Sequence, residues 1–232
     1  MLPKGVRILS TQRYLTGGAS QNNFANFNLA THVGDDPAHV AHNRQLLIDH
    51  FKLPSAPKYL EQIHSAICLD ASGDTCMGDA AITNQPNTLC LVMTADCLPI
   101  FAVRGDGQQV GVAHAGWKGI VGGVIESFVS RFPSQDLHIH FGPAISQAHF
   151  EVGEEVLAQY LDKDPNLGEA FEQRDGRYYL DLYQAARIIL TQLGIQQISG
   201  GDQCTYAQGE QYFSYRRDGQ YSGRMANLIY FE

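Results

Sequence analysis

Residues 89–123 constrain the fold more than any other part of the sequence, because they read as two buried β-strands joined by a tight turn. The runs 89–94 and 110–113 are unbroken apolar segments, which is typical of strands covered on both faces. Between them, residues 104–107 (RGDG) form a hairpin signal, so the strands joined there should be neighbours in a sheet. Pro99 should end the first run, because proline cannot donate to a sheet ladder.

Each of the two apolar runs leads into a residue that metals favour. Cys97 follows the first and His114 follows the second, while His64 lies in another apolar segment, a predicted strand over 60–67. Two histidines and one cysteine leave a fourth tetrahedral position open, as in catalytic zinc sites. The scattered spacing matches no CxxC or HExxH pattern. A buried thiol and two hydrogen-bonded core histidines therefore remain the ordinary alternative.

Composition places the chain among ordinary globular domains. Its 232 residues suffice for one domain with a full core, and no repeat or long linker divides residues 1–232. The net charge of -8 argues against a nucleic-acid partner, because phosphate neutralisation needs a basic face. No run approaches the roughly 20 apolar residues of a membrane span. An N-terminus without a signal-like apolar core and five unpaired cysteines favour a cytoplasmic protein with reduced thiols.

Helical and strand patterns mix along the chain, which predicts an α+β fold with mixed sheets and outer helices. The sequence DDP at 35–37 starts a predicted helix over 37–51. Other helices are predicted over 119–132, 151–161 and 181–193, and other strands over 6–11, 137–141, 178–180, 195–199 and 223–230. His138 and His140 share one strand face, and a polar strand face is the preferred interpretation over a copper-ligand pair.

Three further features are candidates for a pocket near these ligands. Residues 17–20 (GGAS) could direct backbone N–H groups at an anion, with a plain loop as the preferred interpretation. Arg44 lies on the predicted helix 37–51, where its ordinary role would be a solvated charge. Asp79 follows a glycine-containing turn and could point into the same space, or be a simple turn carboxylate.

Short motifs spread over essentially the whole chain carry a family resemblance. They are NLATHVGDDP followed by NR, QIHS, GDAAIT, TADCLPI, HAGWKG, FGPAIS, CTY, YFSYRRDG and SGRMA. In this order they resemble the YfiH family, long called the multicopper polyphenol oxidase or laccase-domain family and now described as purine nucleoside phosphorylases. TADC followed by HAGWKG is the specific part. Lys118 stands where many members carry arginine.

The resemblance implies a layered α/β/β/α fold, which some classifications group with toxin deamidases of the CNF type, and zinc bound by His64, Cys97 and His114. It implies phosphorolysis of adenosine, inosine and 5′-methylthioadenosine to a free base and a ribose 1-phosphate. Adenosine deamination would be a companion activity. The expected partners are a purine nucleoside and phosphate, and the expected assembly is a monomer or weak homodimer.

Roles for individual residues follow from that chemistry. Arg44, Asn28 and Lys118 are the candidates for binding substrate, since an arginine fork matches phosphate oxygens. In deamination, zinc would lower the pKa of a bound water to about 7, and a carboxylate would shuttle the proton. Asp79 is the first candidate for the shuttle and Asp96 the second. The HxE and PCxxC signature of other zinc deaminases is missing.

Other functions remain open at this point. A copper-dependent polyphenol oxidase would need several HxH motifs, and the chain has nine histidines but a single HxH. Cu²⁺ could still occupy a Cys/His₂ site, because it binds such ligands more tightly than Zn²⁺. A hydrolase, including one that edits peptidoglycan precursors, could use Cys97 as nucleophile and His114 as base. A binding module would hold a metal or nucleoside without turnover.

Overall fold

The largest sheet is built around the predicted hairpin. In the computed structural model, which describes residues 3–232, six strands follow the order β11-β7-β5-β6-β3-β2. β5 and β6 pair antiparallel and are joined at the predicted RGDG turn, which confirms the turn and the second strand of the predicted hairpin but not its first strand. The strands of this sheet are β11 (Gln197–Gly200), β7 (Leu137–Phe141), β5 (Leu98–Arg104), β6 (Val110–Ala115), β3 (Ala80–Thr83) and β2 (Cys68–Asp70).

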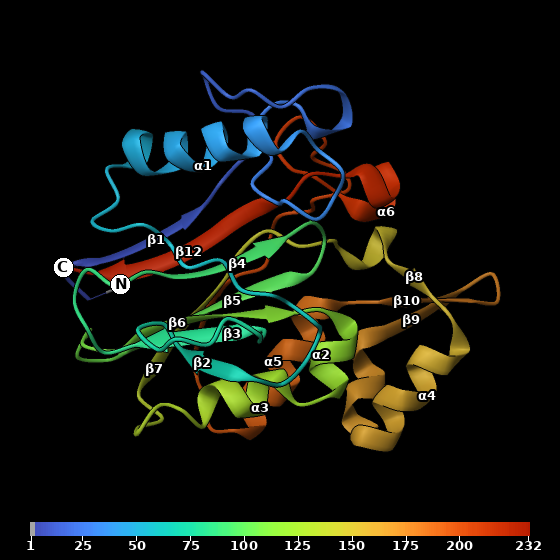
Figure 1. The fold of residues 1–232 in the computed structure, drawn as a ribbon. Coiled ribbons are helices and arrows are strands. Elements are labelled where there is room, and N and C mark those ends of the chain that lie inside the picture. The colour runs from blue at the N-terminus through green and yellow to red at the C-terminus, as the bar shows by residue number, and fades with distance from the viewer. Residues whose placement is uncertain (1–2) are drawn as a thin grey trace.

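A second, three-stranded sheet stacks on one face of the large sheet (Figure 1). Its order is β1-β12-β4, and it contains β1 (Val6–Ser10), β12 (Met225–Phe231) and β4 (Cys90–Thr94). Apolar side chains of both sheets interdigitate between them, Val92 and Ile229 from the small sheet with Phe101 and Val112 from the large one. A third sheet, β8 (Glu151–Val152), β10 (Arg177–Leu180) and β9 (Phe171–Arg174), extends to one side.

Helices cover both outer faces of the stacked sheets. The helix α1 (Pro37–Phe51) has its predicted bounds and lies on the small sheet, where Leu47 packs with Leu91 and Leu228. On the large sheet lie α2 (Trp117–Val121), α3 (Val124–Val129) and α5 (Leu182–Gln192), with α4 (Glu154–Lys163) beside them. The short α6 (Tyr215–Asp218) precedes β12. The α+β class and the α/β/β/α layering are therefore confirmed.

Besides the first strand of the hairpin, three local predictions were wrong, each for a physical reason. The 60–67 segment is a loop, because the backbone N–H groups of residues 63–65 turn toward Asp79 and cannot join a ladder. The 119–132 helix breaks into α2 and α3 at Gly123, whose φ of 90° is left-handed. Pro99 does not end a strand but is the second residue of β5, a strand-start position where a missing N–H is tolerated.

The chain changes sheets between β4 and β5. β4 belongs to the small sheet and β5 to the large one, so Cys97 lies in the turn that crosses between the two layers. The run 89–94 is therefore not the hairpin partner of β6, as predicted; β5 is. Within the described part of the chain, no helix has both the length and the apolar character needed to cross a bilayer.

Candidate metal centre

Three side chains from three different elements converge at the end of the stacked sheets. His64 comes from the loop before β2, Cys97 from the β4–β5 turn and His114 from β6, and their ligand atoms all lie within 4.8 Å of one another. Gly116 keeps the space beside them open. A Cβ at that position would lie 2.8 Å from the Cys97 Sγ and 3.0 Å from the His64 Cδ2. A side chain there would displace the ligands.

The Asp79 carboxylate accepts hydrogen bonds from two of the three candidate ligand residues. Its Oδ1 accepts from His114 Nδ1 at 2.8 Å and from the His64 backbone N–H at 3.0 Å. Its Oδ2 accepts from the Ser65 N–H at 2.6 Å and the Ser65 hydroxyl at 2.8 Å. With Nδ1 donating to the carboxylate, the Nε2 of His114 is free for a metal, an arrangement that second partners of metal-bound histidines commonly impose.

The same carboxylate stabilises an uncommon backbone conformation. His64 has a φ of 58°, in the left-handed region that side-chain-bearing residues seldom adopt. In this conformation the N–H groups of residues 63–65 point together at Asp79. The same loop is also bound to β4, because the Gln62 side-chain amide donates to the Met93 carbonyl and accepts from the Met93 N–H. The His64 ring is thus placed by contacts to two different sheets.

The ligands and Asp79 are electrostatically matched to one another. Burial raises the pKa of the Cys97 thiol, but the charge of His114 and hydrogen bonds with His114 and His64 outweigh it and bring the pKa to about 6. Burial lowers the pKa of His114, but Cys97 and Asp79 raise it to about 9. Without a metal, Cys97 is therefore a thiolate at neutral pH, which is the form that metals bind.

Alkylation of Cys97 should report metal binding directly. The metal-free protein should react with iodoacetamide at Cys97, because the thiolate is the nucleophile. With Zn²⁺ at about 100 times its dissociation constant, that reaction should slow roughly hundredfold. Peptide mass spectrometry measures the rate, and the exposed Cys76 is the internal control whose rate should not change. Equal Cys97 rates with and without Zn²⁺ would remove this residue from the ligand set.

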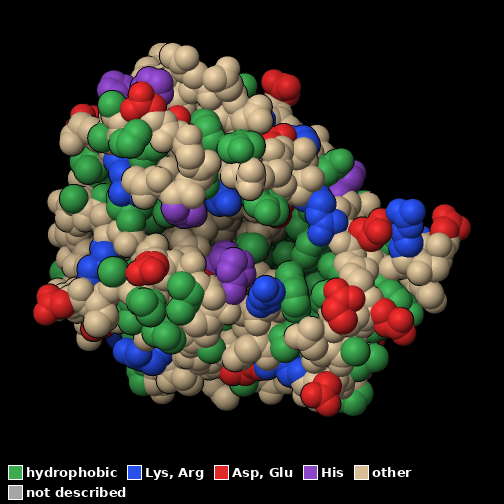
Figure 2. Space-filling model, turned by 45° about the vertical axis from the view of Figure 1, so that its right-hand side comes forward, with side chains coloured by type: hydrophobic (Ala, Val, Ile, Leu, Met, Phe, Trp, Pro, Cys, Tyr) green, Lys and Arg blue, Asp and Glu red, His purple; other side chains and the backbone are tan. Residues whose placement is uncertain are grey.

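The three candidate ligands line a cavity large enough for a nucleoside. Its volume is about 550 Å³, within the usual range of small-molecule pockets. Figure 2 shows the hollow with histidine side chains on opposite sides of it. Aromatic side chains and cations line it beside the ligands; the non-ligand lining residues are His32, Gln62, Met93, Thr94, Ala95, Asp96, Trp117, Lys118, Ile145, Phe150, Leu182, Tyr215, Arg216 and Arg224.

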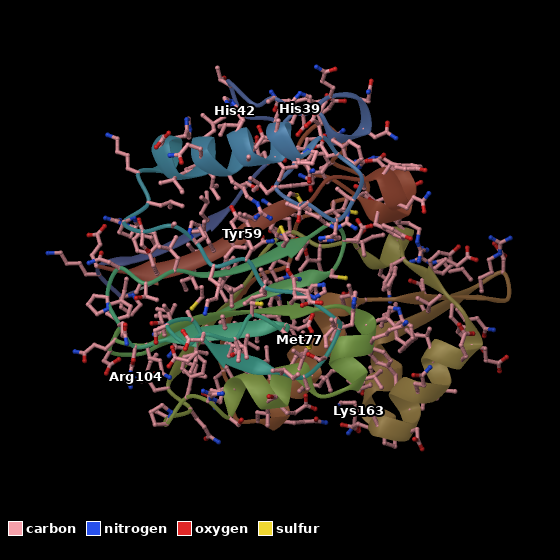
Figure 3. The ribbon with its side chains drawn as sticks, in the orientation of Figure 1. His39, His42, Tyr59, Met77, Arg104 and Lys163 are labelled. Carbon is pink, nitrogen blue, oxygen red and sulfur yellow. The ribbon has the colours of Figure 1, made fainter. Side chains whose placement is uncertain are left out.

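Among the predicted substrate residues, only Lys118 lines this cavity. It is exposed, with its Nζ 5.5 Å from the centre of the Trp117 ring. Arg44 is not a lining residue: its Nε donates to the Leu29 carbonyl, and its guanidinium stacks 3.5 Å from the centre of the Tyr59 ring. Figure 3 shows Tyr59 beneath α1. The role predicted for Arg44 in binding substrate therefore stays a prediction.

Asn28 is also a support rather than a lining residue. It is fully buried, and its amide donates to Ala30 and Asp35. Its Oδ1 accepts from the backbone N–H groups of Ala30 and Arg224. Every polar atom of this side chain is therefore used inside the protein, which does not fit the substrate-binding role predicted for it.

Neither predicted proton shuttle has a free carboxylate oxygen. Asp79 is fully buried, does not line the cavity, and its pKa falls to about 2, because hydrogen bonds with His114 and Ser65 outweigh the burial that raises it. Asp96 lines the cavity, but its two oxygens accept from the Thr205 hydroxyl and the Arg216 N–H. Both carboxylates position other groups in this structure.

Two other predicted features also lie outside the cavity lining. In the 17–20 loop, the Ala19 N–H donates to Asn43 and the Ser20 hydroxyl to Asp35, so these donors are already used. His138 and His140 lie on one face of β7, where His140 Nδ1 is 3.0 Å from the Ser199 hydroxyl. His32 and Arg224 line the cavity and were not among the predicted site residues, although the motifs NLATHVGDDP and SGRMA contain them.

The layered α/β/β/α fold with a His/Cys/His cluster at the wall of a cavity defines a domain with a candidate metal site. The chain belongs to the family described as multi-copper polyphenol oxidoreductase laccase, which matches residues 7–232. It is 43% identical to the purine nucleoside phosphorylase YfiH of Shigella flexneri, over 99% of this chain and 95% of that one. The purine nucleoside phosphorylase of Haemophilus influenzae is also 43% identical, over 100% and 96%.

Solved structures agree with this assignment. The Neisseria meningitidis protein NMB0706, of the family DUF152, superimposes with a TM-score of 0.92 at 40% identity, covering 99% of this chain and 96% of that one. YlmD from Geobacillus stearothermophilus gives a TM-score of 0.87 at 28% identity, covering 99% and 93%. The resemblance to the YfiH family drawn from the motifs is thereby confirmed.

Proposed function

We propose that this protein is a zinc-dependent purine nucleoside phosphorylase that cleaves adenosine, inosine and 5′-methylthioadenosine with phosphate and also deaminates adenosine. The observation that carries the proposal is the convergence of His64, Cys97 and His114 on the wall of a cavity of about 550 Å³. The names of relatives that match the whole chain support the same reaction. A purine nucleoside and phosphate are the substrates.

The donor set fits zinc. One thiolate and two imidazoles are ligands that Zn²⁺ favours, and three protein ligands leave a position for catalysis. When bound, zinc would supply a Lewis acid that polarises a substrate atom. The protein positions the two imidazole ligands through Asp79, which keeps the proton of His114 on Nδ1 and accepts a hydrogen bond from the backbone of His64.

The cavity provides what glycosidic cleavage requires. A phosphate oxygen bonds to C1′ as the C1′–N9 bond breaks, and the electron pair of that bond leaves with the purine. Trp117, Phe150 and Tyr215 give the cavity aromatic surface that suits a planar base, and Ile145 and Leu182 add apolar surface. Lys118 and Arg216, both exposed, add positive charge to the cavity lining, which attracts an anionic substrate.

A second function is favoured by one observation. The Cys97 thiolate beside a positively charged His114 is also the pair that a cysteine-nucleophile hydrolase needs, including one that edits peptidoglycan precursors. Such an enzyme would work without a metal, whereas the phosphorylase would not. The family description makes a copper-dependent polyphenol oxidase the further alternative, with Cu²⁺ on the same three ligands.

One assay separates these functions. Protein with measured zinc and copper content is incubated with adenosine, inosine or 5′-methylthioadenosine, with and without phosphate, and products are separated by chromatography. We expect free base and a pentose 1-phosphate only when phosphate is present, and inosine from adenosine as a further product. Parallel reactions with a muramyl-peptide precursor and a phenol test the alternatives. Absence of phosphate-dependent base release from all three nucleosides would reject the phosphorylase.

A further inference from the structure

Arg224 is a half-buried cation that the protein itself leaves incompletely bonded. Its Nη1 donates to the carbonyls of Ser222 at 2.6 Å and Gly223 at 3.0 Å. Within residues 3–232, its Nε and Nη2 have no hydrogen-bond acceptor and no carboxylate forms an ion pair with it. Burial lowers the pKa of Arg224, which shows that the guanidinium is partly desolvated. Desolvated donors without a partner are costly unless a ligand meets them.

The position of Arg224 is fixed next to the metal centre. Met225, the first residue of β12, pairs with Thr94, the last residue of β4. Arg224 therefore lies beside the 95–97 turn that ends in Cys97, and its backbone N–H is held by Asn28 Oδ1 at 3.0 Å. The two carbonyls that accept from Nη1 hold the guanidinium as well. Such a preorganised fork loses little freedom on binding a ligand.

His32 adds a second unused donor to the same cavity. It lines the wall with Arg224 and makes no hydrogen bond within the described residues. Burial and the charges of Arg224 and Arg44 lower its pKa. The negative charges of Cys97 and Asp96 raise the pKa of Arg224 against the effect of burial. Both Asp96 oxygens already accept hydrogen bonds, from the Thr205 hydroxyl and the Arg216 backbone N–H, and neither accepts from Nε or Nη2 of Arg224. This part of the wall therefore combines positive charge with free N–H groups.

We propose that Arg224 and His32 form a binding subsite for inorganic phosphate beside the metal centre. The Nε and Nη2 of Arg224 match two oxygens of a tetrahedral anion, and one imidazole N–H of His32 reaches a third. Phosphate held there shares the cavity with the nucleoside, as attack on C1′ requires. The choice of phosphate as the anion rests on the proposed function. Asn28 is a positioning residue for Arg224.

The test is the phosphate dependence of zinc-loaded variants. Arg224→Gln and His32→Gln should each weaken phosphate binding in calorimetry, and Arg224→Gln should raise the KM for phosphate about 10- to 100-fold. Arg224→Lys, which keeps the charge but not the fork, should fall between Gln and the native residue. The KM for inosine and the zinc content should stay unchanged. His50→Gln and Arg7→Gln are the matched controls, because both side chains are exposed and neither lines the cavity.

The outcomes separate this subsite from the proposed function. Native-like phosphate affinity in both Arg224→Gln and His32→Gln would overturn the subsite even if the native protein is an active phosphorylase. Because His32 makes no hydrogen bond that its replacement would break, that variant remains informative if Arg224→Gln misfolds. Phosphate binding that depends on both residues, without nucleoside cleavage, would keep the subsite and reject the phosphorylase. The bound anion could also be the phosphate group of a nucleotide, which a titration with adenosine 5′-monophosphate tests. If the Arg224 and His32 substitutions weaken binding of this nucleotide but not of inorganic phosphate, the assignment to free phosphate is overturned.

Discussion

Replacing Cys97 with alanine should abolish metal binding and reduce phosphate-dependent base release by roughly 10³-fold. The variant keeps His64 and His114, but two imidazoles without the thiolate are an incomplete set for Zn²⁺. A metal Lewis acid contributes several kcal/mol to charge stabilisation, which corresponds to about this factor in rate. Elemental analysis gives the zinc content, and chromatography of adenine or hypoxanthine gives the rate.

Metal removal from the native protein provides the matching control. Chelator treatment should lower activity to the level of Cys97→Ala, and added Zn²⁺ should restore the native protein but not the variant. Cys76→Ala, at an exposed thiol, should behave like the native protein in both assays. Full phosphate-dependent activity in Cys97→Ala would show that the site is wrongly assigned. Activity that survives chelation but not the Cys97 substitution would instead indicate a cysteine nucleophile.

The parts of the fold predicted correctly are those set by local chemistry. The Asp36 cap and Pro37 fix the start of α1, and the side chain of Asp36 accepts from the Ala38 N–H as expected for a cap. The RGDG turn defines the β5–β6 hairpin, with Gly107 at a φ of 74°. Alternation over residues 137–141 predicts β7 with its observed bounds. In each case the residues that determine the element lie within it or next to it in the sequence.

The parts missed depend on contacts between distant segments. The 60–67 loop looks like a strand by composition. Its N–H groups at residues 64 and 65 bond instead to Asp79, which follows β2 in the sequence, and so they cannot join a sheet. Pro99 looks like a strand end until β5 is seen to begin beside it. Neither local pattern carries information about its partner, so periodicity alone could not decide these elements.

The candidate site divides in the same way. Chemical type and strand position singled out His64, Cys97 and His114, although spacing alone left them open. The polar residues around the cavity were harder, because an arginine on a helix and an arginine before a strand look equivalent in sequence. The structure stacks Arg44 on Tyr59 and turns Arg224 to the cavity. The pairing of β12 with β4 and the hydrogen bond from the Arg224 N–H to Asn28 make that difference, and neither is visible in the local sequence.

Replacing Asp79 with asparagine should damage both the metal site and the fold. Asparagine offers one acceptor oxygen in place of two, and its NH₂ group would face the N–H and hydroxyl donors of Ser65. Without the carboxylate, the His114 tautomer and the left-handed His64 backbone lose their common partner. We expect zinc affinity to fall about 10- to 100-fold and the free energy of unfolding to drop by about 3–5 kcal/mol.

The pH dependence of the stability difference distinguishes loss of the Asp79 charge from packing damage, which would not change with pH in this range. The Asp79 pKa of about 2 in the folded protein lies below its ordinary value of 3.8, so its stabilisation is complete above that ordinary value and is lost as pH falls toward 2. The stability gap between the native protein and Asp79→Asn, measured by urea unfolding of the metal-free forms, should therefore narrow as pH is lowered from 5 toward 3. Asp162→Asn, at an exposed carboxylate on α4, should change stability by less than about 0.5 kcal/mol. A gap that stays constant with pH, together with native zinc affinity, would mean that Asp79 does not act through its charge.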